Sequence, residues 1–128
     1  MMRSCMLLEI GECNMGGLLV GVALYFFGQT LIWYQTNGQF KWPWFDENPF
    51  LVSCIFAIPI SYAFIIATKY VVGYFDGELW PGRFIGFATG MISFAILTNI
   101  YMGQGINAKT AISLVLATAL VAIQILWK

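Results

Sequence analysis

The sequence predicts an all-α membrane protein, a bundle of four transmembrane helices. Hydrophobic residues make up 60% of the 128 residues, and charged residues make up only 9%. The apolar runs at 16–35, 49–71, 82–102 and 109–127 come close to the roughly 20 residues that a helix needs to cross a bilayer core about 30 Å thick. None of these runs contains Asp or Glu. This composition excludes a water-soluble domain.

The residues before the first apolar run differ in kind from the rest of the chain. They include charged residues and two of the three cysteines, and they contain no sustained apolar stretch. The run Met-Leu-Leu is too short for the apolar core of a signal peptide. We therefore expect residues 1–15 to be a disordered N-terminal extension and 16–128 to be the transmembrane domain. The alternative is that translation begins at Met15.

Catalytic, metal and cofactor chemistry has little support in this composition. The chain has no His, and the third cysteine, Cys54, lies inside the second run, so no Cys pair has the spacing of a metal site. No acid pair and no nucleophile beside a base lie within a span. We expect neither an enzyme nor a bound metal or cofactor, and the expected partner is the lipid bilayer, not a nucleic acid.

The Lys and Arg residues are divided almost evenly between the two ends of the predicted bundle. One end receives Arg3, Lys69, Arg83 and Lys128, and the other receives Lys41 and Lys109. A start at Met15 would reduce this to three against two. Such a balance permits insertion in both orientations. We expect a multi-pass protein of a bacterial-type inner or plasma membrane.

Small residues recur at the spacing that lets membrane helices approach one another. Gly82, Gly86 and Gly90 repeat every four residues on the third span, and Ser113 and Ala117 do so on the fourth. These stripes predict helix-packing surfaces. The glycines of the third span are also compatible with a helix that bends during alternating access.

Polar side chains within the spans are the candidates for a site, because burying them without partners is costly. On the first span, Tyr25, Gln29 and Trp33 are spaced by four residues and give one face a hydroxyl, an amide and an indole N–H. For Gln29, an interhelical hydrogen bond and a place in a site wall are both open interpretations. These three residues are predicted to line a substrate cavity.

The third span adds a cation to the candidate site. Arg83 follows Trp80-Pro81-Gly82 at the start of the span, and Phe87 lies one turn deeper. Arg83 is interpreted either as an anchor whose guanidinium reaches the interface, or as a cavity residue that forks onto a carboxylate or phosphate. Phe87 and Ser61 are further predicted lining residues.

The C-terminal part of the chain carries motifs of a known family. The stretch 101–109, YMGQGINAK, and the apolar run after it resemble the end of the small multidrug resistance proteins and of the wider drug/metabolite transporter superfamily. In those proteins a Gly-Gln or Gly-Glu turn precedes a last helix that packs dimers. Gly90 matches the glycine at the bend of the family's third helix, and 28–31, GQTL, is similar to the middle of its first.

One departure from the family affects the expected mechanism. Proton-coupled exporters of the family carry a membrane-embedded glutamate one turn before the glycine that matches Gly28, and here Tyr25 occupies that place. The loop after the first span is also longer and more aromatic than the family's turn. Members without the glutamate occur among lipid-linked sugar flippase subunits, which the Gly-Gln of the first span fits better.

The resemblance implies a small transporter of the drug/metabolite type. It would move a small organic or lipid-linked solute by alternating access, without a buried acid for proton coupling. The working unit would be a homodimer, for which an antiparallel arrangement is open, or a heterodimer with a similar chain. Two alternatives stay open. One is a structural or regulatory membrane protein that packs against a larger partner. The other is a dual-topology ion channel of the fluoride-exporter type, to which only Gly16-Gly17 is similar.

Overall fold

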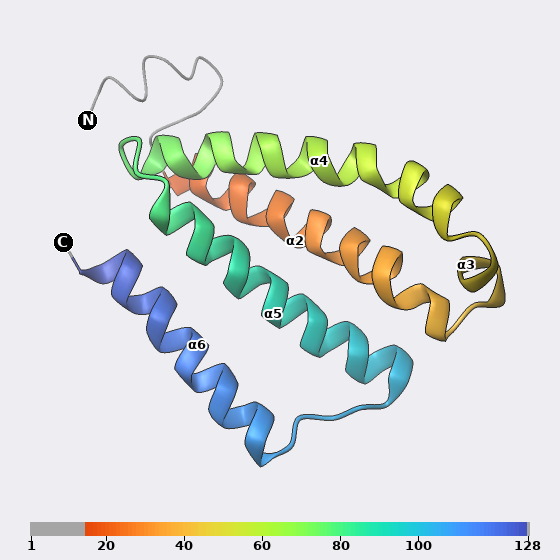
Figure 1. Ribbon diagram of the computed structural model, residues 1–128. Helices are drawn as coiled ribbons and strands as arrows, with labels where there is room; N and C mark the ends of the chain where they lie inside the picture. The colour runs from red at the N-terminus through yellow and green to blue at the C-terminus, as the bar shows by residue number, and fades with distance from the viewer. Residues whose placement is uncertain (1–14, 128) are drawn as a thin grey trace.

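The computed structural model describes residues 15–127 and contains four long helices (Figure 1). The elements are the helix α2 (Met15–Asn37), the 3₁₀ turn η1 (Gly38–Phe40), the short helix α3 (Pro43–Glu47), and the long helices α4 (Pro49–Tyr74), α5 (Trp80–Met102) and α6 (Ala108–Leu126). The predicted four-helix, all-α membrane architecture is confirmed. The expected disordered extension lies outside the described residues, apart from Met15, at which α2 begins.

The helix boundaries differ from the predicted runs at the α4–α5 turn. α4 continues to Tyr74, beyond the predicted run 49–71, and Trp80 and Pro81, which precede the predicted run 82–102, are already part of α5. A proline fits the first turn of a helix because its missing N–H has no intrahelical acceptor there. The connection is therefore a tight turn at residues 75–79, and Asp76 and Gly77 adopt positive φ angles of 56° and 91° within it.

The connection between α5 and α6 begins and ends in recognisable caps. Gly103 closes α5 in the left-handed conformation, with φ at 67°, and its N–H donates to the Asn99 carbonyl oxygen at 3.2 Å. The Asn107 side chain begins α6 by accepting a hydrogen bond from the Thr110 N–H at 2.9 Å. These caps fix residues 103–107 as a short loop between two antiparallel helices.

α2 is the central helix of the bundle, with α4 on one side and α5 on the other (Figure 1). Gly21 makes the closest approach: a methyl group added there would lie 2.7 Å from Val71 Cγ2 and 3.1 Å from the Ala67 carbonyl oxygen of α4. Tyr25 and Ile85 join Ala67 and Val71 in the buried core. α4 and α5 each contact α2 much more than they contact each other.

α6 is the outermost helix and packs mainly against α5 (Figure 1). None of its described residues is buried, and its outward side chains are large and apolar, as are those of α4. Such faces can contact lipid without a hydrophobic cost, whereas their exposure to water would be unfavourable. The start of α2, the α4–α5 turn and the end of α6 lie at one end of the bundle, hereafter the turn end. The opposite end, which contains α3, is the α3 end.

Candidate functional site

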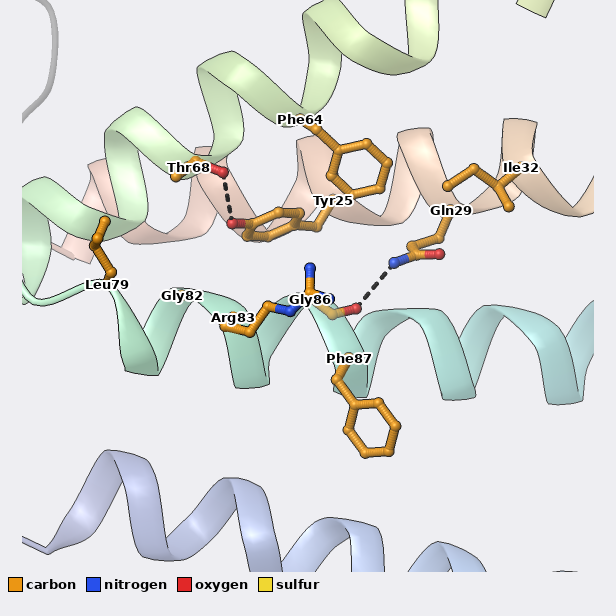
Figure 2. Close-up of a pocket in the computed structure, with 10 residues that line it drawn as sticks. All are labelled: Tyr25, Gln29, Ile32, Phe64, Thr68, Leu79, Gly82, Arg83, Gly86 and Phe87. Atoms are coloured by element: carbon orange, nitrogen blue, oxygen red, sulfur yellow. Dashed lines mark hydrogen bonds between the residues drawn. The ribbon is translucent and has the colours of Figure 1, made fainter. Parts of the chain in front are cut away.

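A cavity of about 660 Å³ lies between α2, α4 and α5 in the half of the bundle nearer the turn end (Figure 2). It runs from Leu79 to Phe87 along α5, which is about 12 Å at 1.5 Å per helical residue, and reaches Gln29 and Ile32 on α2. The remaining wall residues are Tyr25, Phe64, Thr68, Gly82, Arg83 and Gly86. The cavity therefore extends through nearly half of a bilayer core.

Tyr25 forms the wall between α2 and α4. Its side chain is 4% exposed, and its hydroxyl shares a 3.0 Å hydrogen bond with Thr68 Oγ1. The ring packs against Phe64 with a centroid distance of 5.6 Å, and it also faces Gly86, where an added methyl group would lie 3.6 Å from the ring. A methyl group at Gly86 would thus make only ordinary contact with the tyrosine ring.

Gln29 both joins two helices and faces the cavity. Its Nε2 donates to the Gly86 carbonyl oxygen at 3.0 Å, as Figure 2 shows. A methyl group at Gly90 would meet the amide group at 3.0 Å, so Gly90 leaves the space that the amide occupies. The two interpretations of Gln29 are therefore compatible, because one amide group serves the interhelical bond while the residue still lines the cavity.

Among residues 15–127, Arg83 is the single cationic residue of the cavity wall, and it is exposed. In Figure 2 its side chain runs along α5 toward Gly86, on the side away from Leu79. The Arg83 side chain forms no hydrogen bond or ion pair with any residue in 15–127. Phe87, 44% exposed, lies one turn deeper.

Two of the six predicted lining residues, Trp33 and Ser61, lie outside the cavity wall. Trp33 is 2% exposed and packs against α5, where its Nε1 donates to Thr98 Oγ1 at 3.0 Å. Ser61 is exposed on α4. It shares a helix face with Thr68 but lies seven residues nearer the α3 end, about 10 Å beyond it. Ile32, next to Trp33, does line the cavity, so what excludes Trp33 is its burial against α5 and not its depth.

Four lining residues escaped the sequence analysis: Ile32, Phe64, Thr68 and Leu79. Thr68 left a signal, since it is a hydroxyl within an apolar span and one turn from Phe64 on the same helix face. The three apolar residues left none, because the sequence alone does not separate an aliphatic or phenyl group facing a cavity from one facing lipid.

Aromatic side chains fill the space between α2 and α5 at the α3 end. The Trp33 ring stacks on Tyr101 with a centroid distance of 5.3 Å and an interplanar angle of 28°. The Tyr34 and Tyr101 hydroxyls share a 2.7 Å hydrogen bond, and Trp42 packs edge-on against Tyr101 at 5.5 Å. Lys41 Nζ donates to the Tyr101 carbonyl oxygen at 3.2 Å. We call Trp33, Tyr34, Trp42 and Tyr101 the aromatic plug.

The predicted helix-packing residues fall into two groups. Gly82, Gly86 and Gly90 of α5 all face α2, with Tyr25 or Gln29 as neighbours. On α6, Ser113 is exposed and donates to the Lys109 carbonyl oxygen at 3.0 Å, and Ala117 is half-buried. The glycines thus lie at a contact within the chain, whereas Ser113 lies on an outward surface.

A second cavity, of about 930 Å³, lies on the other side of α5 at the turn end. Its wall includes Asp76 and Glu78 from the α4–α5 turn together with Pro81 and Ile85 of α5 and the last residues of α6. Within residues 15–127 no three His, Cys, Asp or Glu side chains gather as ligands for a metal ion.

Comparisons of the chain with protein-family models, with curated proteins and with solved structures give no match. The class of protein follows from the fold: the chain is a multi-pass integral membrane protein, with four transmembrane helices in residues 15–127. The resemblance of this chain to small multidrug resistance proteins stays a prediction from its sequence motifs.

Proposed function

We propose that this protein is a small transporter that moves an organic solute by alternating access as a dimer. The observation that supports this most directly is the cavity between α2, α4 and α5, which has polar groups on its wall, exposed residues at the turn end and the aromatic plug beyond its inner end. A transporter resting in one of its two states has a midplane site that is accessible from one side and closed on the other.

The wall chemistry supports transport that is not driven through a buried acid. The described residues place no Asp or Glu in the lining, and its polar groups are Tyr25, Gln29, Thr68 and Arg83. A carboxylate that alternately binds a proton and a cation is therefore missing from this cavity. The Tyr25 and Phe64 rings offer apolar faces to a solute, and the Gln29 amide offers hydrogen bonds.

The arrangement of the helices supports a dimer. α4 and α5 contact each other little, and their wall residues Thr68, Arg83 and Phe87 are exposed, so these helices do not close the cavity on the side away from α2. A second chain would complete the enclosure that four helices do not provide. α6 presents an outward row of apolar side chains on which two copies can pack.

Alternating access predicts that water reaches a residue that is buried in the present structure. Ser93 lies on α5 toward the α3 end from Gly90 and is 5% exposed. In a background with Cys5, Cys13 and Cys54 changed to serine, we expect a Ser93→Cys protein in lipid vesicles to react with a water-soluble maleimide, because the α3 end opens in the other state. The measurement is the rate of thiol modification by mass spectrometry.

Two further single-cysteine variants control this experiment. Thr68→Cys lies in the cavity wall and should react in either state, whereas Ala63→Cys, 3% exposed on α4, should stay unreactive unless the bundle unfolds. A Ser93→Cys protein as inert as Ala63→Cys would contradict alternating access and favour a static protein that packs against a partner. Equal reaction at Ser93 and Ala63 would indicate local unfolding and would also count against the proposal.

The dimer predicts a cross-link between two copies of α6. Leu116 lies near the middle of α6 and is 62% exposed, so in the same cysteine-free background we expect Leu116→Cys to form a disulfide-linked dimer in membranes at low protein density. Ile58→Cys, 77% exposed on α4 and at a similar depth, is the matched control. Gel mobility before and after reduction measures the dimer. Equal cross-linking at both positions would reflect random collision and contradict an α6 interface.

A further inference from the structure

The charges at the turn end are separated by α5. Arg83 faces the cavity between α2, α4 and α5, whereas Asp76 and Glu78 line the second cavity, together with Pro81 and Ile85 from the other face of the helix. No ion pair links Arg83 to either acid among the described residues. In the part of the chain that the structure describes, the cavity that we propose as the transport site therefore carries one positive charge on its wall and no negative charge.

The orientation of Arg83 is that of a ligand-binding side chain more than that of an interfacial anchor. Side chains on a helix tilt toward its N-terminus, so an arginine in the first turn of α5 reaches the interface easily by pointing backward. Figure 2 shows the opposite: the side chain extends along α5 toward Gly86, deeper into the bundle. Its guanidinium donors have no partner among the residues of 15–127.

The start of α5 adds to the positive potential at the mouth of the cavity. The helix begins at Trp80 with Pro81 in its first turn, and no acidic residue lies in that turn. The N-terminus of a helix carries a partial positive charge that stabilises nearby anions within about one turn. Leu79, Gly82 and Arg83, which lie at this N-terminus, all line the cavity.

The rest of the wall fits an apolar body attached to the charged group. Ile32, Phe64, Leu79 and Phe87 supply aliphatic and phenyl surface, and Phe87 is partly exposed. The Tyr25 and Thr68 hydroxyls already bond to each other, and one N–H of the Gln29 amide bonds to Gly86. The guanidinium of Arg83 therefore offers more free N–H donors than any other group of this cavity wall in residues 15–127.

We propose that the substrate of this cavity is an amphiphilic organic anion, a phosphate or carboxylate on an apolar ring or chain, whose anionic oxygens bind Arg83. This proposal rests on the proposed transport function and names its substrate class. The planar guanidinium presents two parallel N–H donors to such a group, which gives a shorter and stronger bond than a neutral donor does. A lipophilic cation would meet Arg83 with like charge and find no carboxylate to pair with.

The test compares two ring compounds of opposite charge. The wild-type protein in phosphatidylcholine nanodiscs is titrated with phenyl phosphate and with benzyltrimethylammonium, and binding is measured by isothermal titration calorimetry. We expect phenyl phosphate to bind and the cation not to bind. The proposal would be overturned if the cation bound as tightly as phenyl phosphate or more tightly. It would also be overturned if phenyl phosphate bound neither in phosphatidylcholine nanodiscs nor in nanodiscs that contain phosphatidylglycerol.

Three variants locate the charge that is responsible. Arg83→Gln should weaken phenyl phosphate binding by about tenfold or more, because it removes a charge-assisted bond, and Arg83→Lys should retain part of the affinity as a point charge. Lys69→Gln is the matched control, since Lys69 follows Thr68 on α4 but lies outside the cavity wall. Unchanged binding in Arg83→Gln, or an equal loss in Lys69→Gln, would contradict the proposal. If Arg83→Gln fails to fold, the affinity of Arg83→Lys and the preference of the wild-type protein for phenyl phosphate over the cation still test the proposal.

The source of the anion is distinguished by the lipid. Nanodiscs containing phosphatidylglycerol should compete with phenyl phosphate if a lipid headgroup enters between α4 and α5, and should leave its affinity unchanged if the ligand comes from water. Competition that persists in Arg83→Gln would place the lipid elsewhere. The maleimide experiment on Ser93→Cys tests transport independently of the substrate class. Arg83-dependent anion binding in a protein whose Ser93 stays inaccessible would contradict transport and support the anion site. An accessible Ser93 in a protein that prefers the cation would support transport and contradict the anion site.

Discussion

Replacing Trp33 with alanine is expected to lower the free energy of unfolding of the protein in detergent by about 3 kcal/mol, through the void left between α2 and α5. Trp33 is 2% exposed, stacks on Tyr101 and donates to Thr98, so the change removes both the ring contacts and the partner of a buried hydroxyl. The measurement is the loss of helical circular dichroism on heating or on titration with denaturing detergent.

The same substitution at an exposed tryptophan provides the comparison. Trp80→Ala, at the start of α5, should change the free energy of unfolding by less than about 0.5 kcal/mol because its side chain is largely exposed. A double-mutant cycle of Trp33→Phe with Thr98→Val isolates the hydrogen bond, with an expected coupling of about 0.6 kcal/mol and at most about 1.7 kcal/mol. Equal losses in Trp33→Ala and Trp80→Ala would show that the aromatic plug does not hold the helices together.

Gly21→Ala is expected to destabilise the bundle by about 1–3 kcal/mol, because it overpacks the contact between α2 and α4. The added methyl group would lie 2.7 Å from Val71 Cγ2 and 3.1 Å from the Ala67 carbonyl oxygen, and the backbone oxygen has no rotamer by which to move away. The measurements are the midpoint of thermal unfolding in detergent and the fraction of monodisperse protein after purification.

Gly82→Ala is the matched control for this prediction. A methyl group there would lie 3.5 Å from Val71 Cγ1 and 3.7 Å from the Tyr25 hydroxyl oxygen, which are ordinary contact distances. Because alanine also favours the helix by about 1 kcal/mol over glycine, Gly82→Ala should be neutral or stabilising. A Gly21→Ala protein as stable as Gly82→Ala would mean that α4 moves away from α2 at little cost.

Comparison of sequence and structure shows which features of the site can be predicted from spacing. The intervals between Tyr25, Gln29 and Trp33 predict that the three residues share one face of α2, and in the structure this face meets α5. What the spacing did not determine is that this face borders a cavity at Tyr25 and Gln29 and a packed aromatic contact at Trp33. The opposing residues make the difference: Gly82 and Gly86 leave space at the turn end, whereas Thr98 and Tyr101 fill it at the α3 end.

The role of Arg83 was likewise left open by the sequence. An arginine in the first turn of a membrane helix fits both an interfacial anchor and a cavity residue, because its long side chain is able to reach either place. The structure orients it toward Gly86 and places the nearby acids on the other side of α5. This separation depends on which face of α5 meets α2, and α5 alone does not encode that choice.

The sequence by itself determined the class of this protein and the number of its membrane spans. The bilayer thickness sets the length of an apolar run, and each span satisfies its own backbone hydrogen bonds, so both properties can be read locally. Only the tertiary structure decided where along those spans a cavity opens, which side chains line it and which charge they carry. Those features depend on the distance between helices at each depth, and that distance is set by pairs of residues far apart in the chain, such as Gly21 with Val71 and Trp33 with Tyr101.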